Sequence, residues 1–284
     1  MSRIYPNIVP ENNLRLPDAL TIKHGPAPLL SKFVLEGDKA VRAMGIRLHL
    51  RHDFGELVYL NKGEVVKGNW FPVVNMFNPE YCELTPENSY WISGENENGE
   101  IVLTLGGRIY YWPETSLEEE ARGMFYATQA VGKTCIVTAP AAKMITGVVY
   151  CGGAHWVRPD YRGHRLSHLI PRMGRAYVLA RWPVDWAIGL VAPILEKKGV
   201  TGGYGYKNVS YSIFYPGSRW GDLEVGVAYI PVAEVYRDLD AFLGAELSAF
   251  EGGRGFARSS RRTLDEAVTK VSSVPTLHGS NSLS

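Results

Sequence analysis

The sequence predicts a mixed α/β fold in which one central sheet is flanked by helices. Two β-type runs within residues 88–112 are joined at Asn98-Gly99, a dipeptide that strongly favours a tight hairpin turn. A β-rich run over residues 143–157 leads directly into a segment with helical spacing. Two further strand-like runs precede a last amphipathic segment. Strands and helices interleaved in this way are typical of a layered α/β domain.

The N-terminal part of the chain predicts an extended arm followed by helix. Residues 1–28 contain Pro6, Pro10, Pro17, Pro26 and Pro28, which favour an extended arm over the surface. From residue 29 to about residue 60 the apolar spacing becomes helical, so we expect an N-terminal helical extension there.

The centre of the chain predicts a long strand and then a helix. Gly152-Gly153 interrupts the β-rich run, and paired glycines within a strand indicate a bulge or a place where a ligand approaches the backbone. Pro171 would break the hydrogen-bond ladder of the helix that follows, so we expect this helix to begin late, near Ser167, with that side chain as N-cap. The apolar face of this helix consists of Leu166, Leu169, Ile170, Met173, Ala176, Tyr177 and Ala180.

The remaining elements complete a single predicted domain. Residues 115–122 are expected to form an acidic helical or loop insert. The last elements predicted are a buried strand over 184–193, a short helix closed by Gly199, strands over 204–216 and 222–231, and an amphipathic helix over 232–250. The predicted domain therefore covers residues 29–251 with a core at about 88–231, and residues 252–284 form a basic, serine-rich tail that we expect to be disordered.

Composition and charge favour a soluble cytoplasmic protein. The 284 residues are 45% hydrophobic and 21% charged, which is ordinary for a globular chain. The formal charge of +1 gives no argument for binding nucleic acid or an anionic membrane. No apolar run is long enough to predict a membrane span, and the N-terminus does not resemble a signal peptide. The cysteines Cys82, Cys135 and Cys151 are widely spaced, which favours reduced thiols, and we expect no metal site.

The segment that begins at Val157 carries the most informative motif. Val157, Pro159, Tyr161, Arg162 and Gly163 lead out of the predicted strand and directly into the helix. Backbone N–H groups gather at such a turn and stabilise a phosphate, and glycine there permits positive φ.

Arg165 stands where a second glycine is usual in phosphate-binding turns. It removes no N–H group and adds a cation that can pair with a phosphate, provided that it adopts an ordinary φ. The alternative is a basic surface turn without a ligand.

This strand–turn–helix unit resembles the acyl-CoA-binding core of the GNAT superfamily of N-acyltransferases. The family signature is Arg/Gln-x-x-Gly-x-Gly/Ala. Arg162 matches its first position, whereas Arg165 replaces the first glycine and Ser167 replaces the last small residue. The order of elements from about residue 88 to 231, half of the chain, is also similar. The resemblance implies a GNAT-like mixed central sheet with a bulged central strand, flanked by helices, plus the N-terminal helical extension.

The resemblance also implies a donor and the residues that would hold it. Acetyl-CoA or another acyl-CoA would be the co-substrate, with no metal. Its pantetheine arm would lie along residues 153–157, including Gly153, Trp156 and Val157. The residues expected to hold its pyrophosphate are Arg162, Gly163, His164, Arg165, Leu166 and Ser167.

Three side chains are candidates for proton transfer. His155 could deprotonate an amine, since imidazole titrates near neutrality, or it could be a half-buried structural histidine. Many relatives use a tyrosine on the short helix to protonate the leaving thiolate, but Leu195 occupies that place here. Tyr204 and Tyr206 are the nearest substitutes, with packing on a strand as the alternative.

These features predict an N-acyltransferase acting on a primary amine of a small molecule or amino acid, with acetyl as the default acyl group. One alternative is the branch that makes long-chain N-acyl amino acids or autoinducers from acyl-CoA or acyl carrier protein, which the extra arginine and the long N-terminal region favour. Another alternative is a catalytically degenerate protein with the GNAT fold that serves as a binding or regulatory module. The acceptor and the oligomeric state, including a homodimer, are left open.

Overall fold

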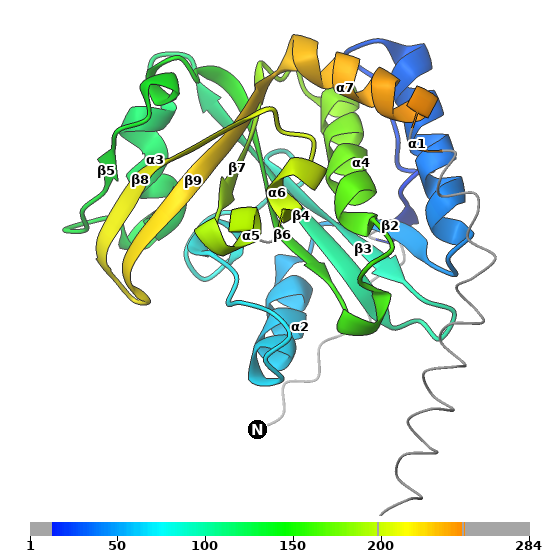
Figure 1. Cartoon of the computed structure of the whole chain (residues 1–284), viewed down its shortest axis with the longest axis horizontal. Helices are drawn as coiled ribbons and strands as arrows, with labels where there is room; N and C mark the ends of the chain where they lie inside the picture. Colours follow the sequence, from blue (N-terminus) through cyan, green and yellow to red (C-terminus); the bar gives the residue numbers. More distant parts are fainter. Residues whose placement is uncertain (1–12, 198, 246, 248–284) are drawn as a thin grey trace, which may run out of the picture.

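The computed structural model describes residues 13–197, 199–245 and 247, and Figure 1 shows their strands in one sheet with helices packed on it. The described strands form a nine-stranded sheet in the order β1-β2-β3-β4-β6-β7-β9-β8-β5. Neighbouring strands are antiparallel except β6 (Gly147–Val157) and β7 (Trp186–Val191), which run parallel. Helix α4 (Leu166–Arg181) connects these two, as a parallel pair requires. The predicted mixed α/β class is confirmed.

From β3 onward the order of the elements follows the prediction, with β5 and α6 as additional elements. The other strands are β1 (Leu14–Arg15), β2 (Arg47–Arg51), β3 (Ser89–Glu95), β4 (Ile101–Trp112), β5 (Ile136–Val137), β8 (Asn208–Ser218) and β9 (Gly221–Pro231). The other α-helices are α1 (Ala27–Arg42), α2 (Phe54–Val66), α3 (Leu117–Tyr126), α5 (Pro193–Lys197), α6 (Val200–Gly203) and α7 (Val232–Ala245).

The N-terminal region differs from its prediction. A helical region was expected from residue 29 to about residue 60, but β2 lies between α1 and α2 and pairs with β3. Its sequence alternates charged or polar residues with the buried Leu48 and Leu50, and this period of two favours a strand. Within the predicted arm, β1 pairs with β2. Residues 1–12 and the predicted tail over 252–284 lie outside the described residues, and the domain bounds stay a prediction.

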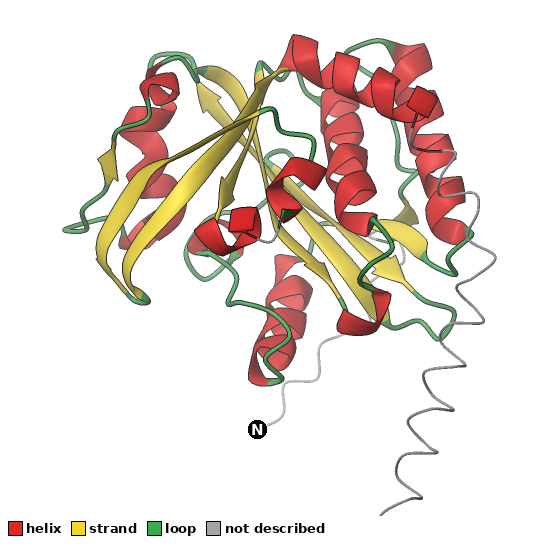
Figure 2. Ribbon diagram, in the orientation of Figure 1, coloured by secondary structure: helices red, strands yellow, loops and turns green. Residues whose placement is uncertain are grey.

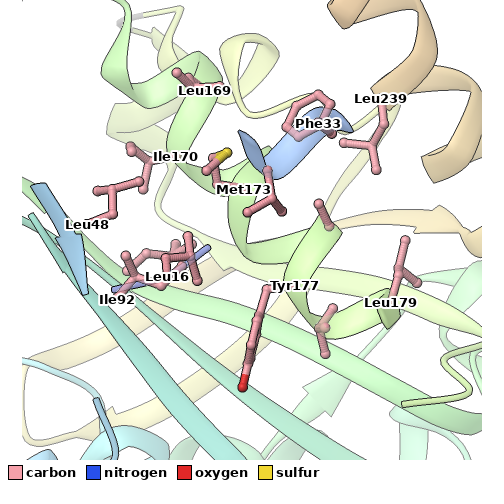
Figure 3. Packing of buried hydrophobic residues seen from close by; sticks show 14 of the residues in the cluster. Leu16, Phe33, Leu48, Ile92, Leu169, Ile170, Met173, Tyr177, Leu179 and Leu239 are labelled. Atoms are coloured by element: carbon pink, nitrogen blue, oxygen red, sulfur yellow. The ribbon is translucent and has the colours of Figure 1, made fainter. Parts of the chain in front are cut away.

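Two apolar cores lie on opposite faces of the sheet. Figure 2 shows helices on both sides of the strands. Helices α1, α4 and α7 pack together on one face, where Phe33, Met173 and Leu239 meet (Figure 3). Helices α2 and α3 cover the other face. Tyr150 and Cys151 are neighbours on β6 and belong to the two different cores, as the alternation of a strand requires.

The sheet opens between β6 and β7. Their pairing runs from Val149↔Trp186 to Gly152↔Gly189 and then ends. Beyond this point β6 stays paired with β4, and β7 with β9. The two strands therefore part in the middle of the sheet, and the backbone of residues 153–157 faces the gap on its β7 side.

The bulge of β6 lies one residue beyond the predicted place. Gly152 and Gly153 pair regularly with Gly107 and Gly106, whereas the register shifts between Thr104 and Gly106. On β6 the irregular residue is Ala154, which has φ +46°. The glycine at 153 is required for packing instead, because a Cβ there would lie 2.4 Å from Cε2 of Phe77.

The C-terminal elements confirm the predicted strand, short helix, hairpin and long helix. The strand predicted over 204–216 begins later, at Asn208, because α6 covers the residues just before it and Tyr204 ends that helix. Tyr204 and Tyr206 therefore lie in a connection beside the sheet and not on a strand.

Candidate active site

The turn before α4 has two residues with positive φ. Gly163 has φ +85°, and Arg165 has φ +58° and ψ +17°, the left-handed conformation. The condition that Arg165 adopts an ordinary φ is therefore not met. Arg165 takes a conformation that glycine adopts without a steric cost, and the turn forms here without glycine at this position.

Helix α4 begins earlier than predicted. Arg165 is its N-cap residue and Ser167 is its second residue, so Ser167 is not the cap. Pro171 lies inside the helix, which continues to Arg181. The expectation of a late start is wrong because Leu169, Ile170 and the rest of the inner face are buried, and this burial offsets the loss of a single N–H at the proline.

The start of α4 offers hydrogen-bond donors to a ligand. The backbone N–H groups of Gly163, Leu166 and Ser167 donate to no backbone acceptor among the described residues. The positive end of the helix dipole lies at the same place. Arg162 holds the turn against its surroundings, since its Nε donates to Val157 O and its Nη2 to Asn69 O, each at 2.9 Å. This arrangement favours an anion.

Two cavities adjoin the turn and the open sheet. We call the first the turn cavity: it encloses about 590 Å³ against Gly163, Arg165, Leu166 and Ser167, with Trp156 and Val157 on its β6 side. Arg162 lines it too, whereas His164 lines neither cavity.

The second cavity lies where β6 and β7 part, and we call it the split cavity. It encloses about 240 Å³ between residues 152–154 of β6 and residues 189–191 of β7. Met76 and Phe77 bound it on one face of the sheet, and Pro171 and Arg175 on the other. It therefore passes through the sheet.

The two cavities adjoin each other, and we call them together the groove. Trp70, Phe71, His155, Leu195 and Tyr204 line both of them. The groove leads from the donors of the turn, along the β6 backbone, to the gap in the sheet. It brings the predicted phosphate, pantetheine and proton-transfer residues together, with His164 as the exception.

His155 lies at the junction of the two cavities. Its ring meets that of Tyr204 edge to face, with the centroids 5.5 Å apart, and its Nε2 has no partner in the described part of the chain. Burial lowers the pKa of His155 from its ordinary 6.5 to about 4. The imidazole is therefore neutral throughout the physiological range, where it can accept a hydrogen bond but is a weak base.

The two tyrosines differ in what their hydroxyls do. The Tyr206 hydroxyl donates to Ile188 O at 2.8 Å, and burial raises its pKa. Burial also raises the pKa of Tyr204, to about 12, so this phenol keeps its proton at the junction. Leu195 lines the same junction as Tyr204.

Several residues of the groove were missed by sequence reasoning. The connection after α2 supplies Phe71 and Phe77. It also supplies Trp70, a tryptophan that the sequence already allows in an apolar pocket, and the stacked rings of Trp70 and Trp156 have centroids 5.2 Å apart. The aromatic run over residues 70–77 was the available signal, but nothing local places it against β6. Arg175 was missed because a charged residue on a helix is normally assigned to its exposed face.

No described helix is both long and apolar enough to cross a membrane. Within the described ranges, no group of three or more His, Cys, Asp or Glu side chains is arranged to hold a metal ion.

Comparisons with known proteins gave likenesses of fold alone. No family model matches the chain, and no curated protein matches it in sequence. A variant of the spermidine N-acetyltransferase SpeG from Vibrio cholerae is 9% identical, with a TM-score of 0.40 over 67% of this chain and 96% of that one. NAA60 of Arabidopsis thaliana in complex with acetyl-CoA is 7% identical, with a TM-score of 0.42 over 66% and 99%. At these values the likenesses carry no argument about activity.

The conformation of Arg165 predicts an unusual effect of substitution. We expect Arg165→Gly to be about 1 kcal/mol more stable than Arg165→Ala, because only glycine adopts this conformation without a steric cost. Both variants lose the same guanidinium, so the comparison isolates the backbone. Urea unfolding of the two variants measures the difference. An alanine variant as stable as the glycine variant would contradict the left-handed conformation.

The environment of His155 predicts a dependence of stability on pH. The folded pKa of about 4 lies below the ordinary 6.5, so the unfolded chain binds a proton first as the pH falls through this window. We therefore expect the wild type to lose stability between pH 6.5 and 4 relative to His155→Gln. Denaturant unfolding at a series of pH values measures this, and parallel curves for the two proteins would refute the desolvated imidazole.

Proposed function

We propose that this protein is an acyl-CoA-dependent N-acyltransferase that transfers an acyl group from the thioester to a primary amine. The observation that carries the proposal is the pair of adjoining cavities that extends from the donor-rich start of α4 to the gap between β6 and β7. A long ligand with an anionic end and a slender arm fits such a groove.

Each part of the donor has a matching part of the groove. The pyrophosphate of acyl-CoA would accept hydrogen bonds from the N–H groups of Gly163, Leu166 and Ser167, with Arg165 as an added cation. The pantetheine arm contains amides, which can pair with the backbone of residues 153–157, where β6 has no partner on its β7 side. The thioester would then reach the junction at His155 and Tyr204.

The chemistry requires one proton to move from nitrogen to sulfur. The amine nitrogen attacks the thioester carbonyl carbon, a C–N bond forms, and the C–S bond breaks with its electron pair on sulfur. Tyr204 donates its proton to the leaving thiolate, and the proton that nitrogen loses restores the phenol. His155 accepts a hydrogen bond from the attacking amine and orients it, a role that suits a neutral imidazole.

The geometry favours an active enzyme over a degenerate one. Arg165 replaces a signature glycine, but its backbone takes the left-handed conformation and the turn keeps its N–H groups. Leu195 replaces the expected tyrosine, but Tyr204 lines the same junction.

Thiol release with any amine from a panel would separate an enzyme from a protein that only binds CoA. Acyl-CoAs of increasing length in the same assay would separate an acetyltransferase from the long-chain alternative.

A negative charge introduced at the start of α4 is predicted to weaken the binding of acetyl-CoA without lowering the stability of the protein. We expect Ser167→Glu to bind acetyl-CoA about tenfold more weakly than Ser167→Gln, because the carboxylate repels the pyrophosphate. A glutamate in the first turn of a helix is favourable, so Ser167→Glu should be at least as stable as Ser167→Gln. Calorimetric titration with acetyl-CoA and thermal unfolding measure both quantities. Equal affinities in the two variants would place the pyrophosphate elsewhere, and no binding to the wild type would overturn the proposed function.

Tyr204 and Tyr206 provide a matched test of which side chain protonates the leaving thiolate. We expect Tyr204→Phe to lower kcat by about tenfold, at the low end for a general acid because a thiolate is a good leaving group, with the KM for acyl-CoA little changed. Tyr206→Phe loses the hydrogen bond to Ile188 O, so we expect it to lose about 1 kcal/mol of stability and to keep its kcat. If Tyr206→Phe loses turnover while Tyr204→Phe keeps it, the assignment is wrong.

A further inference from the structure

The split cavity is lined by a charge that the proposed reaction does not use. Arg175 projects from α4 into its wall, and the side chain is 1% exposed. Of the described residues that line this cavity, Arg175 is the one with a permanent charge. A buried guanidinium needs acceptors for its five N–H bonds.

The neighbouring Arg172 shows how such a group is satisfied. Its Nε and Nη2 donate to the two oxygens of Asp238 at 2.8 and 2.9 Å. Its Nη1 donates to the carbonyls of His168 and Gly203 at 2.7 and 2.8 Å. Arg172 thus takes both oxygens of Asp238 in a bidentate pair.

Arg175 is not satisfied in the same way. Its Nη2 donates to Tyr204 O at 2.6 Å, and the nearest oxygen of Asp238 is 3.5 Å away, beyond a good hydrogen bond. Its Nε and Nη1 are buried and have no hydrogen-bond partner in the described ranges. The guanidinium lies over the ring of Tyr206, at 4.9 Å from the centroid, so the face of this ring supports its charge.

The local charge does not balance. Two guanidinium groups share the single carboxylate of Asp238, so the cluster carries a net charge of +1. Among the described residues, the cavity wall has no Asp or Glu that would compensate this charge. Burial raises the pKa of Tyr150 and of Cys151 to about 12 each, so both stay neutral. An unpaired positive charge beside a cavity with mostly apolar lining favours an anionic ligand.

We propose that the split cavity binds a carboxylate and that Arg175 pairs with it. This inference rests on the proposed acyl transfer and names its substrate class. The carboxylate belongs either to the amine acceptor, which is then an amino acid, or to the acyl group, which is then derived from a dicarboxylic acid. Both sources present the same anion to Arg175, and experiment separates them.

The experiment compares matched ligands with and without the carboxylate. In the acceptor arm, L-amino acids with small, branched and aromatic side chains are compared with their amides, using acetyl-CoA as donor. In the donor arm, succinyl-CoA is compared with butyryl-CoA, using the amides as acceptors. We expect kcat/KM to favour the carboxylate by at least tenfold in one arm, since hydrogen bonds to charged groups are strong. The arm that responds identifies the source.

Variants of Arg175 link the preference to this side chain. We expect Arg175→Gln to lose the preference and Arg175→Lys to keep part of it, while both bind CoA as the wild type does. The comparison of carboxylate and amide ligands uses the wild-type protein, so it tests the carboxylate site even if these variants fail to fold.

Two different failures can be told apart. If acyl-CoA is turned over and neither arm prefers the carboxylate, the carboxylate site is wrong and the transferase stands. If no acyl-CoA binds, the transferase is wrong, and calorimetry with the same amino acids and amides, and with succinate and succinamide, still tests the cavity. Carboxylates that bind at least tenfold more tightly than the amides would then support the site, and equal or absent binding of both would overturn it.

Discussion

The parting of β6 and β7 is the constraint on which the site depends. These strands pair only as far as Gly152 and Gly189, and each then follows its other neighbour. Space is limited at the last pair, since a Cβ at Gly189 would lie 3.4 Å from the Gly152 carbonyl and 3.3 Å from the Tyr206 hydroxyl. Beyond it, the gap exposes one edge of β6 and lets a cavity pass through the sheet. A continuous sheet would pair these backbone groups internally and leave no room for a pantetheine arm.

Helix α4 sets the other end of the groove. It is the crossover between the two parting strands, so its start necessarily lies near the gap. Packing against α1 and α7 fixes its position (Figure 3), and Arg172 clamps it to Asp238 of α7. The N–H groups at its start, the edge of β6 and the gap therefore belong to one packed unit. Such packing suits the proposed acyl transfer, which requires thioester and amine to be held in a fixed geometry.

Local signals predicted most of the fold. The Asn98-Gly99 turn, the strand before the basic turn and the helix after it are determined by neighbours in sequence, and the structure has them. Strand β2 was missed because five residues of alternation are hard to separate from an adjoining helical pattern. The strand expected at Tyr204 begins only at Asn208, since a short helix takes the preceding residues.

The site was harder to predict because it depends on non-local contacts and on rare conformations. Sequence placed the turn before α4 correctly in the chain but could not show that Arg165 is left-handed, a conformation that arginine seldom adopts. The loop carrying Trp70 reaches β6 only through the tertiary fold. Arg175 carries a charge that pattern reasoning assigns to solvent, and its burial follows from the packing of α4 against the sheet and α7.

Hydrogen exchange of the backbone amides with and without CoA tests the central claim most directly. If the groove holds the donor as proposed, CoA will slow exchange at Gly163, Leu166 and Ser167 and along residues 153–157, while the paired part of β6 before Gly152 will not change. Binding of CoA that leaves the amides of the turn and of the open β6 edge unprotected would contradict the account.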